Sequence, residues 1–222
     1  MSDAASSAVC AQIDNVSKLF GAFAALKQVS ATLELGKCYV LVGENGAGKS
    51  TLLRILAGLL RPSHGSVTVF GGQEPQEARD RIGYMSHAAM IYDELTGREN
   101  LRYFAALYGN RKCLTPDEAL VQVGLDPNLA RPLGQYSQGM RQRTSLARVL
   151  LAQPELLLLD EPFSNMDVES AGRMVELLAR FRDGRTIVIT THQRELAAPI
   201  ADYVLALKAG RVASFEPGRP SL

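Results

Sequence analysis

The sequence predicts an α/β fold: a mostly parallel sheet with a small antiparallel β part and an inserted α-helical lobe. Apolar runs typical of buried strands alternate with segments of helical periodicity in both halves of the chain. Residues 87–152 carry helical signals and no strand-like run, so we assign them to the lobe and residues 1–86 and 153–222 to the core. A length of 222 residues suffices for one such domain.

Short strand-like segments lie near the N-terminus, at residues 9–16, 29–35 and 67–70, and glycines punctuate them. We expect these segments to form the small antiparallel sheet. Phe20 lies between the first two segments. An aromatic ring there can lie flat on a nucleobase, although packing is the commoner role of such a residue.

A glycine-rich loop, GENGAGKST, joins an apolar strand-like run at residues 39–42 to a predicted helix at residues 52–60. Strand, glycine loop and helix together are the context of a phosphate-binding loop, and this context disfavours a chance match. Lys49 is expected to bridge the β- and γ-phosphates, Ser50 to bind Mg²⁺ and Thr51 to reach the α-phosphate. The predicted nucleotide-binding residues of the loop are Gly43, Glu44, Asn45, Gly46, Ala47, Gly48, Lys49, Ser50 and Thr51.

The predicted lobe contains two capping boxes of the form Thr-x-x-Glu, at residues 96–99 and 115–118. Each begins a segment with apolar residues at helical spacing. The lobe closes with YSQGMRQR and an apolar helix. Ser137 and Gly139 at the start of this helix are either an ordinary N-cap or a second anion-binding site.

Two predicted buried strands end in polar residues. Leucines 156–159 run directly into Asp160 and Glu161, and the apolar run 186–191 is followed by His192. Parallel strands carry such residues to the sheet edge where ligands bind. Asp160 is expected to hold Mg²⁺ through water, and Glu161 to deprotonate the attacking water. A single His is usually structural, but at this edge we expect His192 to contact the γ-phosphate.

Composition narrows the class of protein further. The chain has 24 basic and 23 acidic residues and a net charge of +1, which argues against nucleic acid as its main partner. No apolar run reaches the ~18 residues of a transmembrane helix. The first eight residues lack the basic start and apolar core of an export signal. The 3 cysteines are widely spaced, as expected for reduced thiols of a cytosolic protein.

The motifs GENGAGKST, YSQGMRQR, LLLLDEP, SNMD and TTH resemble, in order and spacing, those of the ATP-binding subunits of ABC transporters, over residues 10–215. The resemblance implies a P-loop NTPase core that hydrolyses ATP with Mg²⁺ to drive transport. It also implies a homodimer that clasps two ATP molecules head to tail. Ser137 and Gly139 would then touch the γ-phosphate in the other copy, Asp167 would cross the interface, and Phe20 would stack on adenine.

The family resemblance also implies integral membrane subunits as partners, docked in a groove of the helical lobe. The ATPase would then be cytoplasmic and peripheral on the inner face of the cell membrane. The signature, usually LSGGQ, has Tyr136, Gln138 and Met140 at its variant positions, a form that looks like exporters with separately encoded membrane subunits. In SNMD, where SALD is common, only Asp167 transfers safely.

His87 stands where the family has a Gln that touches Mg²⁺ and the attacking water. The expected metal-binding residues are therefore Ser50, Asp160 and His87. A neutral imidazole can bind a metal or accept a hydrogen bond from water, whereas a protonated one can do neither. We predict that ATP hydrolysis falls below about pH 6.5 and that His87→Gln abolishes the fall. An unchanged pH profile of phosphate release in that variant would refute the role.

The segment GYMSHAAMIYDELTGRENLRYFAALYG is similar to the ATP-binding subunit of the haem exporter of cytochrome c maturation. Export of a drug, polysaccharide or lipid is the alternative within the family. Two other classes remain open: a soluble ABC-type ATPase that acts on nucleic acid, ribosomes or iron–sulfur assembly, and a scaffold with little turnover. Tandem ATPase domains, long coiled coils or a basic face would favour the soluble ATPase. A phosphate-release assay would distinguish a scaffold from an active ATPase.

Overall fold

The computed structural model describes residues 8–109 and 111–218. We predict that the first eight residues carry no export signal. Residues 1–7 of this segment lie outside the described part of the chain. A six-stranded sheet of order β5-β6-β7-β3-β8-β9 forms the centre of the molecule; all neighbouring strands are parallel except the β8–β9 pair. Its strands are β3 (Cys38–Val42), β5 (Ile82–Met85), β6 (Leu156–Asp160), β7 (Thr186–Thr190), β8 (Tyr203–Lys208) and β9 (Arg211–Pro217).

The predicted antiparallel sheet is confirmed, with strand order β2-β1-β4. Its strands are β1 (Val9–Phe20), β2 (Phe23–Glu34) and β4 (His64–Val69). The hairpin of β1 and β2 extends beyond the predicted segments, since backbone pairing continues to the turn between Phe20 and Phe23. Asn15 and Gln28 have positive φ within this hairpin, and the register shifts there. Such irregularities interrupt the apolar alternation from which strand ends are predicted.

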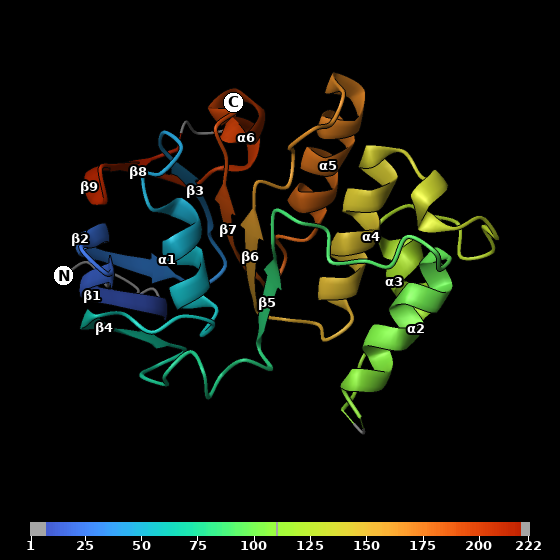
Figure 1. Cartoon of the computed structure of the whole chain (residues 1–222), viewed down its shortest axis with the longest axis horizontal. Helices are drawn as coiled ribbons and strands as arrows, with labels where there is room; N and C mark the ends of the chain where they lie inside the picture. Colours follow the sequence, from blue (N-terminus) through green and yellow to red (C-terminus); the bar gives the residue numbers. More distant parts are fainter. Residues whose placement is uncertain (1–7, 110, 219–222) are drawn as a thin grey trace, which may run out of the picture.

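The helices lie mainly at one end of the molecule, and the antiparallel sheet lies at the other, with the six-stranded sheet between them (Figure 1). The mixed α/β class, the mostly parallel sheet and the helical insertion are therefore confirmed. The helices are α1 (Lys49–Leu56), α2 (Gly97–Leu107), α3 (Pro116–Gln122), α4 (Gln138–Leu150), α5 (Val168–Arg180) and α6 (Arg194–Ala197), with 3-10 turns at Leu133–Gln135 and Ala198–Ile200.

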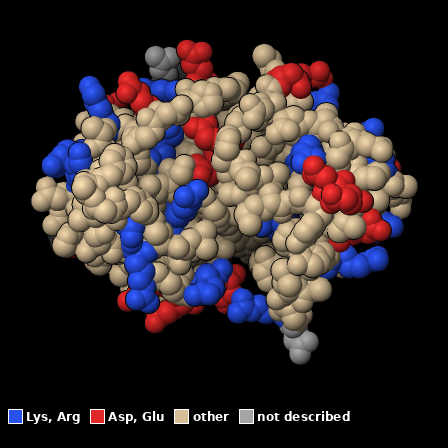
Figure 2. Space-filling model, in the orientation of Figure 1, with Lys and Arg blue, Asp and Glu red and all other residues tan. Residues whose placement is uncertain are grey.

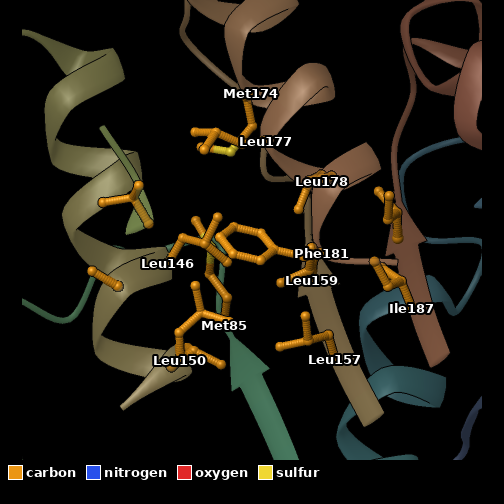
Figure 3. Packing of buried hydrophobic residues seen from close by; sticks show 14 of the residues in the cluster. Met85, Leu146, Leu150, Leu157, Leu159, Met174, Leu177, Leu178, Phe181 and Ile187 are labelled. Carbon is orange, nitrogen blue, oxygen red and sulfur yellow. The ribbon is translucent and has the colours of Figure 1, made fainter. Parts of the chain in front are cut away.

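The central sheet separates two hydrophobic cores. Along β6, Leu157 and Leu159 face the core shared with the helical lobe, whereas Leu156 and Leu158 face the core shared with α1 and the antiparallel sheet. Successive side chains of a strand point to opposite faces, so a strand between two cores is apolar at every position. Figure 3 shows the lobe-side core, where Leu146 and Leu150 of α4 pack near Leu159.

Both predicted capping boxes are present. Thr96 caps α2 and accepts from the N–H of Glu99, and Thr115 caps α3 in the same way. The helix predicted over residues 52–60 is shifted toward the N-terminus, since α1 begins at Lys49 and ends at Leu56. Gly58, with φ of +68°, lies in the left-handed region just after this end.

The division into a core of residues 1–86 and 153–222 and a lobe of residues 87–152 stays a proposal. The positions of α2, α3 and α4 within the lobe support it. Among the described residues, none of the helices combines the length and the hydropathy needed to cross a bilayer.

Candidate nucleotide-binding and hydrolytic site

The loop between β3 and α1 has a backbone that only glycine permits at two positions. Gly43 has φ of +150°, and a Cβ on it would lie 2.3 Å from the carbonyl oxygen of Leu207. Gly48 has φ of +104°, and a Cβ there would lie 2.6 Å from the carbonyl oxygen of Ala25. Side chains are excluded at both points. The loop is thus pressed against β2 and β8 and leads directly into the N-terminus of α1, where backbone N–H groups favour an anion.

Lys49 brings a buried positive charge into this loop. Its Nζ donates to the carbonyl oxygens of Gly43, at 2.7 Å, and Glu44, at 3.2 Å. The same Nζ lies 3.9 Å from Oε1 of Glu161, and only 6% of Lys49 is exposed. The ammonium group therefore lies between the glycine loop and the acid at the end of β6.

Asp160 and Ser50 meet beside the loop. Oδ1 of Asp160 accepts from Oγ of Ser50 at 2.9 Å and from Oγ1 of Thr190 at 2.7 Å. Oδ2 of the same carboxylate lies 3.4 Å from the hydroxyl of Tyr84, and Asp160 is 2% exposed. A buried carboxylate beside a hydroxyl offers the oxygen ligands that Mg²⁺ takes together with substrate phosphates. This donor set therefore fits Mg²⁺.

No group of three or more His, Cys, Asp or Glu side chains within residues 8–109 and 111–218 is arranged to hold a metal ion by protein ligands alone. A site with one carboxylate and one hydroxyl matches a metal that arrives with a phosphate.

Glu161 and His192 are joined by a direct contact. Oε2 of Glu161 lies 2.9 Å from Nδ1 of His192, while the N–H of Glu161 donates to the carbonyl oxygen of Thr190 at 3.1 Å and to its Oγ1 at 3.0 Å. Glu161 has φ of +51°, a conformation that costs of order 1–3 kcal/mol for a residue with a side chain. Such strain is typical of functional sites. The three predicted strand-end residues thus converge on one edge of the sheet.

The other predicted loop residues lie on its rim. Glu44, Asn45 and Gly46 are exposed and Ala47 is buried. A hollow of about 200 Å³ borders these four residues and the β8–β9 turn. Ser50 and Thr51 lie on α1 and are half-buried.

Phe20 lies at the tip of the β1–β2 hairpin and is 50% exposed. The ammonium of Lys18 is 5.3 Å from the centre of its ring. The strand that follows, β2, reaches the phosphate loop, because Ala25 lies against Gly48. The Phe20 ring is therefore half exposed on a hairpin whose second strand borders the phosphate loop.

The signature segment begins α4, with Ser137 as its N-cap, which accepts from the N–H of Met140. The unusual residues of this segment share a neighbour. The guanidinium carbon of Arg131 lies 5.4 Å from the ring centre of Tyr136, and its Nη2 lies 3.4 Å from Sδ of Met140. An aromatic face and a soft sulfur both suit a guanidinium, so Arg131 contacts both of these unusual residues.

Asp167, another predicted site residue, is the N-cap of the neighbouring helix α5. Gly139 lies in the first turn of α4. Among the described residues, no hydrogen bond or ion pair joins Ser137, Gly139 or Asp167 to the group formed by Lys49 and Glu161. The predicted site therefore consists of two separate parts within one chain.

His87 is connected to the group formed by Lys49 and Glu161 through Ser164. Its Nδ1 lies 3.3 Å from Oγ of Ser164, and that hydroxyl donates to the carbonyl oxygen of Glu161 at 2.9 Å. A serine hydroxyl has one proton to donate. Nδ1 of His87 is therefore assigned as the donor, which leaves Nε2 as the acceptor on an exposed ring.

Three residues of the site escaped the sequence analysis: Thr190, Tyr84 and Ser164. Thr190 is fully buried and supplies a hydroxyl to Asp160 and a backbone carbonyl to Glu161. Its position in an apolar run of β7 carries no signal of this role. Its place opposite Asp160 follows only from the parallel register of β6 and β7, which the structure provides.

Replacing Thr190 by Val is expected to lower the free energy of unfolding by about 1–3 kcal/mol. The change keeps the shape but leaves the buried carboxylate of Asp160 and the N–H of Glu161 each without one partner. Turnover should fall as well. Chemical denaturation and phosphate release measure the two effects, with Thr32→Val, at an exposed position of β2, as the control. Wild-type stability and turnover in Thr190→Val would contradict the assignment.

A mostly parallel sheet, a glycine loop before a helix and acids at the next strand end define a nucleoside triphosphatase of the P-loop class. The family model described as ABC transporter matches residues 26–164. The chain belongs to this family, as an ATP-binding subunit that hydrolyses ATP in coupling to transport. Its substrate is ATP and its cofactor is Mg²⁺.

Curated relatives are similar over most of the chain. The ABC transporter ATP-binding protein NatA of Bacillus subtilis is 36% identical over 196 residues, which cover 85% of this chain and 80% of NatA. The Nod factor export ATP-binding protein I of Rhizobium johnstonii is 38% identical over 226 residues, which cover 96% of this chain and 70% of that protein.

Among solved structures, an ATP-binding cassette in a dimeric post-hydrolysis state with bound ADP and Pi superposes with a TM-score of 0.84. Its sequence is 26% identical, and the match covers 94% of this chain and 99% of that one. The fold class predicted from sequence agrees with this similarity.

Proposed function

We propose that this chain cleaves the γ-phosphate of ATP at the sheet edge where Lys49, Glu161 and His192 meet. The observation that carries the proposal is one connected group: Nζ of Lys49 lies 3.9 Å from Glu161, whose other carboxylate oxygen lies 2.9 Å from His192. A cation for phosphate and a base for water are thereby held within one site. These are the two groups that hydrolysis of a phosphoanhydride requires.

In the proposed mechanism, the loop N–H groups and Lys49 hold the triphosphate, and Phe20 stacks on adenine. Ser50 and Asp160 would hold Mg²⁺, which would neutralise charge on the phosphates. Glu161 accepts a proton from water as the water oxygen bonds to the γ-phosphorus and the bond to the ADP oxygen breaks. His192 orients Glu161 through Nδ1 and contacts the γ-phosphate.

We also propose that two copies complete the site. Ser137 and Asp167 lie away from Lys49 within one chain, and both are accessible at helix starts where they can face a second copy. Gly139 follows Ser137 in the first turn of α4 and is buried within one chain. The similar cassette of known structure is dimeric. In this arrangement Ser137 and Gly139 complete the phosphate site of the other copy, and Asp167 crosses between them.

The transported molecule is proposed to be haem, exported for cytochrome c biogenesis. The similarity of residues 83–109 to the haem-exporter subunit supports this cargo. The alternative is another exporter, and the named export of Nod factor and of fluoroquinolones by relatives favours it. In either case the ATPase would be cytoplasmic and bound to the inner face of the membrane through integral subunits.

Exposed apolar side chains of the lobe support such a membrane partner. Met90, Tyr92, Tyr103 and Leu107 are each at least 45% exposed, and the rings of Tyr92 and Tyr103 are 5.1 Å apart. Exposed apolar side chains that lie together, as these two rings do, favour contact with another protein. A soluble ATPase acting on nucleic acid is the second class; Figure 2 shows basic and acidic side chains interspersed on the viewed face, a pattern that disfavours it.

Two measurements test this function in turn. Phosphate release by the purified chain with ATP and Mg²⁺ tests the ATPase; absence of release, alone and with the membrane subunits encoded beside it, would overturn it. Loss of covalently haem-bound c-type cytochromes after deletion of the gene, restored by the wild-type gene and not by Glu161→Gln, tests the cargo. Normal cytochromes in the deletion strain would favour another exported molecule.

A further inference from the structure

Helices α4 and α5 touch at their first turns through Gly139 and Ser170. A Cβ placed on Gly139 would lie 2.8 Å from Oγ and 2.9 Å from Cβ of Ser170. Both distances are shorter than real Cβ contacts allow, so one helix would have to move away. Gly139 is thus required by packing inside one chain, independently of any ligand.

Ser170 also holds Asp167. Its N–H donates to Oδ1 of Asp167 at 2.8 Å, which is the ordinary N-cap bond. Its hydroxyl donates to Oδ2 of the same carboxylate, also at 2.8 Å. The second bond is more than the cap needs. It fixes both oxygens of an exposed carboxylate in one orientation.

From these two contacts we infer that Ser170 is a positioning residue that joins the signature turn and Asp167 into one rigid surface for the second copy of the chain. The inference rests on the proposed dimer. Ser170 is not itself a predicted nucleotide contact; it touches Gly139 and Asp167 of the second part of the site. The Cβ and Oγ of Ser170 pack against Gly139. The hydroxyl proton of Ser170 orients Asp167.

The electrostatics of Asp167 agree with this role. The bond from the N–H of Ser170, and then the bond from its hydroxyl, lower the pKa of the Asp167 carboxyl. An ionised carboxylate is the form that accepts both bonds. Removing the hydroxyl should therefore raise the pKa of Asp167 part of the way, because the N–H bond remains. This shift is a property of the monomer and needs no dimer.

The first experiment compares Ser170→Ala with the control Ser66→Ala on β4, both in the Glu161→Gln background. ATP-induced dimers are measured by analytical ultracentrifugation, and the titration of Asp167 is followed by NMR without nucleotide. We expect Ser170→Ala to weaken dimerisation about tenfold and to raise the pKa of Asp167, with neither effect in Ser66→Ala. Unchanged dimerisation together with an unchanged pKa would overturn the inference.

The second experiment separates packing from contact with phosphate. Gly139→Ala is combined with Ser170→Gly, which removes the atoms that the new methyl group would meet. We expect Gly139→Ala to weaken dimerisation at least about tenfold alone and clearly less in the Ser170→Gly background. An equal loss in both backgrounds would assign Gly139 to the ligand alone and overturn the inference.

These outcomes also differ from failure of the proposed dimer. If Glu161→Gln with Ser170 intact stays monomeric in ATP, the dimer proposal fails. The coupling of Ser170 to Asp167 is then still decided by the NMR titration, where an unchanged pKa counts against it.

Discussion

Replacing Glu161 by Gln is expected to lower the rate of ATP hydrolysis about 10²- to 10⁴-fold while ATP remains bound. The amide keeps the shape of the side chain and can still contact Nδ1 of His192, but it cannot take a proton from water. The pair with Lys49 also loses its charge. Single-turnover phosphate release and equilibrium binding of ATP separate the two effects, and dimers with trapped ATP should accumulate.

Glu155→Gln is the matched control for this variant. Glu155 precedes β6 on the surface and pairs with Arg81, far along the strand from Glu161. The same chemical change there should leave turnover within about twofold of wild type. If Glu161→Gln turned ATP over at the wild-type rate, Glu161 would not be the base.

Replacing Lys49 by Ala is expected to weaken ATP binding about 10²-fold or more. The ammonium is the only Lys or Arg group with an ion pair to Glu161 in the described part of the chain, and it already lies at the loop carbonyls of Gly43 and Glu44. Charge-assisted hydrogen bonds contribute roughly 1.5–3 kcal/mol each, so loss of those to phosphate reaches this size. Titration calorimetry with ATP and Mg²⁺ measures the change.

A folding defect must be separated from the loss of binding in this variant. Lys37→Ala, before β3, serves as the control, and the thermal midpoint without nucleotide is measured for both. We expect Lys49→Ala to fold and yet to lose the stabilisation that ATP gives the wild type. Wild-type affinity for ATP in Lys49→Ala would contradict the assignment of the loop.

The core of the fold follows from local sequence, and so does much of the site. Glycines that match a phosphate loop, a leucine run that ends in Asp160, and Thr-x-x-Glu caps all act over a few residues, so the sequence alone predicts them. The strand ends of β6 and β7 also predict that Glu161 and His192 meet, since parallel neighbours bring their ends to one edge.

The partners of these residues could not be predicted in this way. Tyr84 lies 76 positions from Asp160 and Thr190 lies 30 positions from it, so only the sheet order brings their hydroxyls to the carboxylate. The contact of Ser170 with Gly139 depends on how closely α4 and α5 approach. The early end of α1 likewise depends on the turn at Gly58, although Leu59 and Leu60 continue the apolar spacing.

The central claim is that the triphosphate gripped by the loop lies within reach of the groups at the ends of β6 and β7. A crystal structure of Glu161→Gln with ATP and Mg²⁺ measures this directly. We predict that the γ-phosphate lies in hydrogen-bond contact with Nζ of Lys49, with the substituted side chain and His192 on its far side and Mg²⁺ beside Ser50 and Asp160. A nucleotide seated elsewhere, or strand-end side chains directed away from its phosphates, would contradict the account.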